Sequence, residues 1–262
     1  MTHPNAALRA VILDVDGTLA ETERHGHRVA YNQAFGELGA DLEWTESFYG
    51  DLLNIEGGQE RLDHYLRTYR PDFTPDEGVD EFVGNIHQRK NAHYHAMLGA
   101  GQLPLRPGVR RLIDECRNAG LRLAIASSSL RANVHALLTQ MLDPNAESWF
   151  EAIVTGDDIA QKKPAPEAYE RVLERLDLTP EECIAIEDSH YGCRAAVAAG
   201  VPTIVTTSSY TNQHAFDGAL LVADCLGDPD TPWHVARGDV TGAAYLDING
   251  LQRLHEVALA SS

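Results

Sequence analysis

The sequence predicts an α/β protein with a doubly wound parallel sheet and an inserted all-helical domain. Short apolar segments recur along most of the chain and alternate with amphipathic helical patterns. This alternation is typical of parallel strands that are joined by crossover helices. The stretch from Glu21 to about Leu103 interrupts it, because this stretch carries helical patterns and no convincing strand. It is too long for a single crossover, which favours a domain inserted into the sheet domain.

Six apolar segments have the length of short strands, and helical patterns separate them. The expected strands are Leu8–Leu13, Leu121–Ala126, Ala152–Val154, Cys183–Ile186, Thr203–Val205 and Ala219–Val222. The expected helices of the sheet domain are Val109–Ala119, Pro166–Leu176 and Tyr191–Ala199. The first and third of these helices end at glycine, as helices commonly do. Thr179–Glu182 is a capping box with proline at the first helical position. After a loop at Asp224–Trp233, we expect an edge strand and a final helix within Gly242–Ala260.

The inserted stretch divides the chain into two expected domains. Helical patterns cover Glu23–Leu38, Glu60–Tyr69 and Glu77–Met97, and the chain returns to the sheet domain near Leu105. We therefore expect a catalytic core at residues 1–19 and 104–262 and a helical cap at residues 20–103. Because the insertion follows the carboxyl end of the first strand, the cap is expected to act as a lid over the crevice there.

Composition narrows the class of partner. The chain has a formal net charge of −18, with 44% hydrophobic and 23% charged residues. Such a charge disfavours nucleic acid and anionic lipid as partners, and an anionic substrate would need local positive charge at its site. The four cysteines show no metal-binding or redox spacing, which indicates reduced, mostly buried thiols. The N-terminus lacks the layout of a signal peptide and no segment approaches a membrane span, so we expect a cytoplasmic protein. We also expect a monomer, although the sequence itself does not give the oligomeric state.

The most informative segment is Asp14-Val15-Asp16-Gly17-Thr18, directly after the first expected strand. Ligands of open α/β sheets gather beyond the carboxyl ends of the strands, so both aspartates are expected to face a crevice. Two neighbouring carboxylates repel each other unless a cation binds or one of them is protonated. A metal ion between them could neutralise a substrate phosphate while one aspartate attacks it and the other transfers protons. The alternative is an ordinary strand-end turn.

Hydroxyl and amino groups follow the second and third strands. Ser127-Ser128-Ser129 precedes an expected helix, where hydroxyls and backbone N–H groups suit phosphate oxygens; capping of that helix is the alternative. Lys162-Lys163-Pro164 follows the third strand, in a chain with only three lysines against 18 arginines. This bias indicates that one of the two positions needs a compact ammonium, which could neutralise a phosphoryl group and an aspartate. A chance pair on the surface is the alternative.

An acidic pair, Glu187-Asp188, follows the fourth strand and could complete an oxygen-rich magnesium site with Asp14. The alternative is that one of these acids caps the helix that begins near His190. Each of the four signals is weak or moderate by itself. Together, at successive strand ends, they point to phosphoryl-transfer chemistry.

These four motifs resemble the four motifs of the haloacid dehalogenase superfamily and occur in the same order. The matching residues are Asp14–Thr18, Ser127, Lys163 and Glu187–Asp188. The resemblance covers essentially the whole chain, and it implies a Rossmann-like core with the cap of the subclass that contains β-phosphoglucomutase. The chain looks closer still to CbbY-type phosphatases, which are associated with removal of xylulose-1,5-bisphosphate in carbon-fixing bacteria. The residues that carry this closer resemblance are Glu21–Glu23, Gly26–Phe35, Gly57–Arg61 and Lys162–Pro166.

The resemblance implies a role for each motif residue. Asp14 is expected to be the nucleophile that forms an aspartyl-phosphate, and the side chain of Asp16 to protonate the leaving group and then activate water. Mg²⁺ is expected to bind Asp14, the backbone carbonyl of Asp16, and Asp188, with Glu187 in or near its coordination shell. Ser127, with Ser128 beside it, and Lys163 are expected to hold the phosphoryl oxygens. The chemistry agrees, since a carboxylate displaces an alkoxide from phosphorus only when charge is cancelled and the alkoxide is protonated.

Residues of the cap are expected to choose the sugar phosphate. The relatives usually carry Gly-Gly-Lys-Glu-Arg where this chain has Gly57-Gly58-Gln59-Glu60-Arg61, so the contact to a second phosphate is weakened or shifts to Arg61. An exposed helical position is the alternative for Arg61. Glu21 and His27 are further candidates for substrate contact, although a histidine on a helix is more often packed or solvated.

The leading function is a Mg²⁺-dependent sugar-phosphate phosphatase, with xylulose-1,5-bisphosphate as the leading substrate and other small phosphomonoesters as alternatives. A β-phosphoglucomutase-like isomerase is the first rival, because it uses the same two aspartates. A binding protein that merely kept the fold is the second. Asp16 argues against a dehalogenase, which lacks this second aspartate. A phosphonate hydrolase needs a cap lysine, and Lys90, the only candidate, is expected to be exposed.

Overall fold

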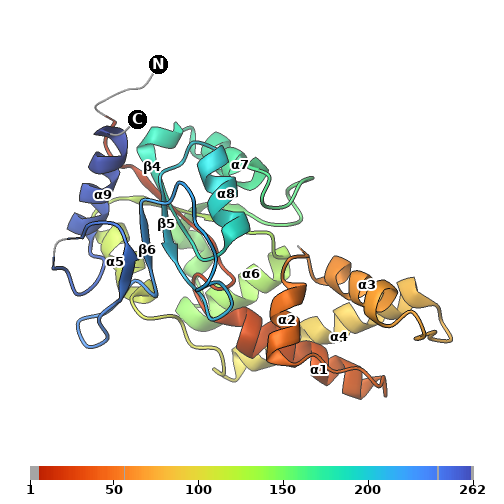
Figure 1. Ribbon diagram of the computed structural model, residues 1–262. Coiled ribbons are helices and arrows are strands. Elements are labelled where there is room, and N and C mark those ends of the chain that lie inside the picture. The colour runs from red at the N-terminus through yellow and green to blue at the C-terminus, as the bar shows by residue number, and fades with distance from the viewer. Residues whose placement is uncertain (1–5, 56, 241, 261–262) are drawn as a thin grey trace. The chain divides into compact units, whose positions relative to one another are not determined.

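The computed structural model describes residues 6–55, 57–240 and 242–260. Contacts divide the chain into two compact units, and Figure 1 labels most of their helices and some of their strands. The helical unit is Thr22–Leu103, and the core unit is formed by the segments before and after it.

The core unit is built on one seven-stranded sheet. Its strands are β1 (Ala10–Leu13), β2 (Arg122–Ala126), β3 (Phe150–Val154), β4 (Cys183–Glu187), β5 (Thr203–Thr206), β6 (Leu221–Ala223) and β7 (Val235–Arg237). They lie in the order β3-β2-β1-β4-β5-β6-β7, and only the β6–β7 pair is antiparallel. The predicted doubly wound parallel sheet is therefore confirmed. The edge strand was predicted after Gly242, which is wrong: β7 ends at Arg237. With three residues, two of them exposed, β7 is too short for a sequence pattern to reveal it.

The strand order places one topological switch point between β1 and β4. From β1 the chain proceeds to β2 and β3 on one side, and then crosses to β4, β5 and β6 on the other. Leu13 at the end of β1 is in register with Ile186 of β4, so the loops after these two strands start side by side. Open α/β sheets bind their ligands at such a point.

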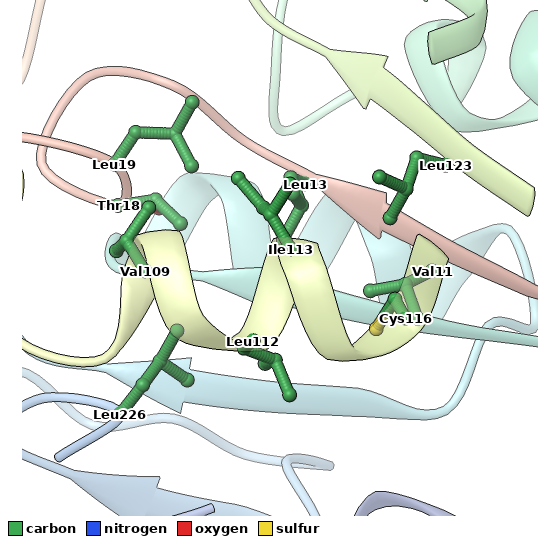
Figure 2. A pocket seen from close by; sticks show the side chains of 10 residues that line it. All are labelled: Val11, Leu13, Thr18, Leu19, Val109, Leu112, Ile113, Cys116, Leu123 and Leu226. Carbon is green, nitrogen blue, oxygen red and sulfur yellow. The ribbon is translucent and has the colours of Figure 1, made fainter. Parts of the chain in front are cut away.

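Helices cover both faces of the sheet, and alternate side chains of β1 face the two helical layers. Its Val11 and Leu13 face α5 (Val109–Asn118) across a small apolar space, seen in Figure 2. Its Ala10 and Ile12 belong instead to the core cluster formed with α7 (Glu167–Leu176) and α8 (His190–Ala198). A strand that is buried on both faces needs a continuous apolar run, which is what β1 supplies.

The remaining helical elements of the core unit are short turns and the C-terminal helix. They are α6 (Arg131–Leu137), a π-helical turn at Leu138–Leu142, 3₁₀ turns at Ala146–Trp149 and Pro180–Glu182, and α9 (Ile248–Ala260). The predicted capping box at Thr179 is present with both of its hydrogen bonds, but it starts only the single 3₁₀ turn before β4.

The helical unit packs around one tryptophan. It contains a π-helical turn at Glu23–His27, α1 (Arg28–Glu37), α2 (Glu46–Leu52), α3 (Gly58–Tyr69) and α4 (Val79–Gly99). Trp44 is fully buried, with the rings of Tyr31, Phe35, Tyr49 and Tyr65 at centroid distances of 4.6, 5.2, 5.5 and 5.4 Å. The sequence pattern predicted one helix over Glu23–Leu38. Its first turn is π-helical instead, at Gly26, where a Cβ would lie 3.0 Å or less from Tyr94 and Leu103.

Three expectations about burial and membranes can be compared with the structure. All four cysteines are free and buried, as predicted. Lys90 is buried rather than exposed: its ammonium lies 5.4 and 5.5 Å from the ring centroids of Tyr31 and Tyr94, a cation–π arrangement that a polar sequence context does not reveal. Among the described residues, no helix is both long enough and apolar enough to cross a membrane.

Candidate active site

The loop after β1 places Asp14 at the switch point. The Asp14 side chain is buried, and its Oδ2 accepts a hydrogen bond from Thr18 Oγ1 at 3.0 Å. Gly17 turns the loop with a φ of +84°, a conformation that L side chains rarely adopt. A Cβ at Gly17 would lie 2.2 Å from Oδ2 of Asp188, so only glycine fits this close approach.

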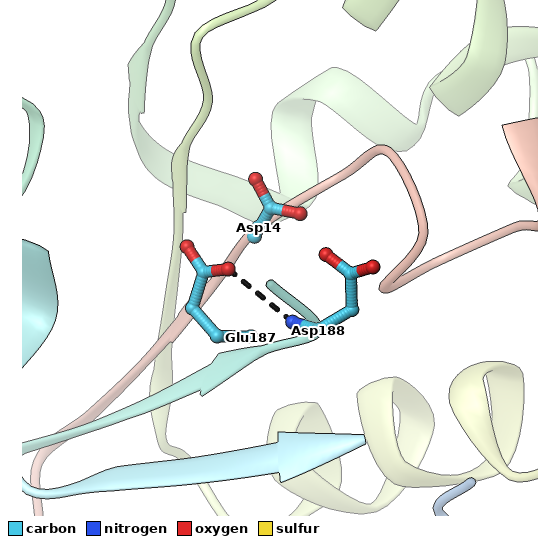
Figure 3. A group of neighbouring side chains, drawn as sticks. All are labelled: Asp14, Glu187 and Asp188. Atoms are coloured by element: carbon cyan, nitrogen blue, oxygen red, sulfur yellow. Dashed lines mark hydrogen bonds between the residues drawn. The ribbon is translucent and has the colours of Figure 1, made fainter. Parts of the chain in front are cut away.

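The loop after β4 brings Glu187 and Asp188 to Asp14. Figure 3 shows the three carboxyl groups around a common space, and one oxygen from each lies within 4.8 Å of the others. All three side chains are buried. The N-cap of α8 is Ser189, whose Oγ accepts a hydrogen bond from Gly192 N at 2.9 Å. The alternative in which one of the two acids caps this helix is therefore wrong.

Lys163 neutralises part of this acidic cluster. Its Nζ donates hydrogen bonds to Asp14 Oδ1 at 2.7 Å, Glu187 Oε1 at 2.5 Å and the carbonyl oxygen of Ala126 at 3.0 Å. Three acceptors in three directions match the three donors of an ammonium. The side chain is 4% exposed, so the chance surface pair does not describe Lys163.

Charge in the cluster is unbalanced, since three buried carboxyl groups share one ammonium. Burial, followed by the charge of Glu187, raises the pKa of Asp14 to about 7 although Lys163 opposes the rise. Burial and the charges of Asp14 and Glu187 raise the pKa of Asp188 well above its usual range. Burial works against the charge of Lys163, yet Asp14 and Glu187 outweigh it and raise the pKa of Lys163. Oxygen donors with this excess of negative charge fit a hard divalent cation.

The serines after β2 lie beside Asp16. Ser129 Oγ donates a short hydrogen bond to Asp16 Oδ2, and Ser127 Oγ accepts one from Ser129 N at 3.1 Å. Ser128 Oγ is buried and has no hydrogen-bond partner among the described residues. Because α6 begins after Leu130 without a side-chain cap, the helix-capping alternative for this cluster is wrong.

Three further residues support the acidic cluster, and no sequence motif indicates them. Tyr169 of α7 is fully buried and donates a hydrogen bond to Glu187 Oε1 at 2.6 Å. Ser208, in the loop after β5, lies near Asp188, and its hydroxyl opposes the rise in the pKa of that carboxyl. Arg106, where the chain re-enters the core unit, donates to the carbonyl oxygen of Gly17. Each of these contacts joins residues far apart in the sequence, so no local spacing announces them.

The remaining candidate residues lie elsewhere. Glu21, in the core unit, lies 3.7 Å from Arg106 and accepts a hydrogen bond from Ser209 Oγ at 3.1 Å. His27, Gln59 and Arg61 belong to the helical unit. His27 is buried against Tyr94, with ring centroids 4.2 Å apart, whereas Gln59 is exposed on the first turn of α3.

Arg61 is buried, so the exposed alternative is wrong. Its Nη1 donates to the Tyr49 hydroxyl at 3.0 Å, its Nε donates to the Leu52 carbonyl at 3.2 Å, and it lies 3.7 Å from Glu23. These contacts hold the guanidinium within the helical unit.

Comparison with known proteins identifies the family. A model of the haloacid dehalogenase-like hydrolases matches residues 8–200, which is most of the chain. The chain therefore belongs to this family, and the predicted class of enzyme, a phosphatase of the haloacid dehalogenase type, is confirmed.

Within the family, the chain is similar to CbbY proteins. It is 46% identical to the plasmid-encoded CbbY of Cupriavidus necator over 254 residues, which cover 96% of this chain and 98% of that protein. The crystal structure of CbbY from Rhodobacter sphaeroides in complex with phosphate is 39% identical, with a TM-score of 0.75, and the match covers 83% of this chain and 94% of that one. A mutant of the same CbbY, solved in complex with xylulose-(1,5)-bisphosphate, is 38% identical, with the same TM-score and coverage.

Proposed function

We propose that this enzyme is a Mg²⁺-dependent sugar-phosphate phosphatase that acts through an aspartyl-phosphate on Asp14. The observation that carries the proposal is the buried group of Asp14, Glu187 and Asp188, with Lys163 bonded to the first two. Three acids and one ammonium at the switch point suit a reaction in which a cation and a phosphoryl group enter together.

Each residue then has a distinct part in the reaction. An Asp14 oxygen attacks phosphorus, the bond from phosphorus to the sugar oxygen breaks, and Asp16 gives its proton to the leaving oxygen. In the second half, Asp16 takes a proton from water, the water oxygen bonds to phosphorus, and the Asp14 carboxylate leaves. Ser127 and Lys163 hold the phosphoryl oxygens throughout, and Ser129 orients Asp16 through their hydrogen bond.

Mg²⁺ would be held by the carboxylates of Asp14 and Asp188 and the backbone carbonyl of Asp16, with Glu187 beside it. When bound, it supplies positive charge that offsets the repulsion between the acids and the incoming phosphate. The local potential needed in a chain of net charge −18 would come from this ion and Lys163.

We further propose xylulose-1,5-bisphosphate as the substrate, because the similar CbbY mutant was solved with that ligand. The match covers 94% of that protein. Gln59, which stands in place of the usual lysine on the exposed first turn of α3, is then the position where binding of a second phosphate is tuned.

A phosphate-release screen over sugar monophosphates and bisphosphates tests the proposed function. Wild type is expected to release phosphate from xylulose-1,5-bisphosphate most efficiently, and Gln59→Lys to tighten bisphosphate binding more than monophosphate binding. Equal effects of Gln59→Lys on both would remove Gln59 from the second-phosphate contact. With β-glucose 1-phosphate and a priming bisphosphate, glucose 6-phosphate that forms faster than free phosphate would establish the mutase instead.

A further inference from the structure

The Arg106 side chain is buried where the chain re-enters the core unit. Its backbone N–H donates to the Leu19 carbonyl at 2.8 Å, and its Nη1 donates to the Gly17 carbonyl. Arg106 therefore holds the loop after β1 at two points, one through its backbone and one through its guanidinium.

The same guanidinium also binds two other strand-end loops. Nη1 donates to the carbonyl of Thr206 at 2.9 Å, and Nη2 donates to the carbonyls of Thr207 and Asp224. Nε lies 3.7 Å from Glu21. The planar fork thus joins the loops after β1, β5 and β6, which an ammonium with its three donors could not do in the same geometry.

Two of these loops, those after β1 and β5, lie against Asp188. Gly17 presses against the Asp188 carboxylate so closely that a Cβ would lie 2.2 Å from it. The loop after β5 carries Ser208, whose hydroxyl lies near the Asp188 carboxyl. A shift in either loop would therefore change where the Asp188 oxygens lie.

We propose that Arg106 is a positioning residue of the active site, which fixes the Gly17 turn and the β5 loop around Asp188 without touching the substrate. The proposal rests on the proposed function, because it assigns Asp188 to the cation.

Arg106→Lys tests the proposal, with Arg111→Lys as the matched control. Arg111 is another multiply bonded arginine of the core unit, and it joins Asp228, Glu115 and the carbonyls of Gly227 and Leu246 rather than the loop after β1. We expect Arg106→Lys to weaken Mg²⁺ binding in calorimetry and to lower kcat by about 10–100-fold, as is usual for residues that orient metal ligands. The KM of Arg106→Lys is expected to change little. Arg111→Lys is expected to lower Tm about as much as Arg106→Lys does, but to keep the Mg²⁺ affinity and the kcat of wild type.

The outcomes separate the two ideas. If wild type releases no phosphate, the proposed function fails, while the comparison of Mg²⁺ affinities still tests Arg106. Unchanged Mg²⁺ affinity in a folded Arg106→Lys, or an equal loss in Arg111→Lys, would overturn the positioning role. Arg106→Gln serves as a second variant; if neither Arg106 variant unfolds cooperatively, Arg106 is needed for the fold itself and the proposal is overturned.

Discussion

Gly17→Ala is the substitution that tests the geometry of the site most sharply, because Gly17 combines a positive φ with contact to Asp188. Its φ of +84° makes any Cβ strained by about 1–2 kcal/mol. In addition, the new Cβ would stand 2.2 Å from Asp188 Oδ2, so the carboxylate must move by about 1 Å. Forcing a side chain off its rotamer costs about 0.5–1.5 kcal/mol more.

Gly120→Ala separates strain from displacement. Gly120 has a φ of +74° and no atom within 4 Å of a Cβ, and it precedes β2, at the opposite end of the sheet from the site. In Gly120→Ala, backbone strain alone is expected to lower the free energy of unfolding, by about 1–2 kcal/mol, and activity is expected to stay at the wild-type level. Gly17→Ala is expected to lose about 1 kcal/mol more than this control.

Activity should separate the two variants further. A displacement of about 1 Å at a catalytic group typically costs about 100-fold in rate, so kcat of Gly17→Ala is expected to fall by that factor. Urea unfolding gives the stabilities, and phosphate release under saturating Mg²⁺ gives kcat. Equal stabilities and equal kcat values for the two alanine variants would refute the close contact between Gly17 and Asp188.

Three further predictions follow from neighbouring contacts. Tyr169→Phe removes one hydrogen bond to the charged Glu187 and is expected to cost about 1.5–3 kcal/mol in urea unfolding; an unchanged unfolding free energy would contradict that bond. Asp188→Asn relieves repulsion in the metal-free cluster, so it is expected to raise the metal-free Tm yet abolish the rise in Tm that Mg²⁺ gives wild type; a preserved Mg²⁺ effect would place the cation elsewhere. Burial opposes the charge of Asp158, but hydrogen bonds from Arg175 and Thr155 outweigh burial and lower the pKa of Asp158 to about 2. The ionised Asp158 therefore contributes to stability above pH 4, and this contribution is lost as pH falls from about 4 to 2. Asp158→Asn should flatten that part of the stability profile, and a profile that keeps its wild-type slope would exclude Asp158 as its source.

The sequence was informative wherever the chemistry follows directly from the end of a strand. Asp14 and Glu187 stand where apolar runs end, and Lys163 lies in the loop that follows another such run. Parallel strands bring their carboxyl ends to one edge of the sheet. A reader of the sequence can therefore expect these three residues to meet, because the fold class alone brings them together.

Other features depend on tertiary packing and could not be predicted in this way. Tyr169 looks like one more apolar position of α7, and only the fold shows that its hydroxyl reaches Glu187. Arg106 binds backbone carbonyls, which have no signature in the sequence. Lys90 and Arg61 are buried polar residues that contact aromatic rings, so the sequence wrongly placed Lys90 at the surface and left an exposed position open for Arg61.

Trapping of the phosphoenzyme tests the central claim, that Asp14 carries the phosphoryl group. The substrate p-nitrophenyl phosphate has a leaving group that needs no proton, so Asp16→Asn should still be phosphorylated while its hydrolysis step is slow. We expect a burst of one p-nitrophenolate per enzyme, with the mass of one phosphoryl group on the peptide that contains Asp14. A burst without label on that peptide would contradict the assignment of Asp14 as the nucleophile. Steady release of p-nitrophenolate without a burst, after Asp14 is replaced by Asn in both wild type and Asp16→Asn, would contradict it as well.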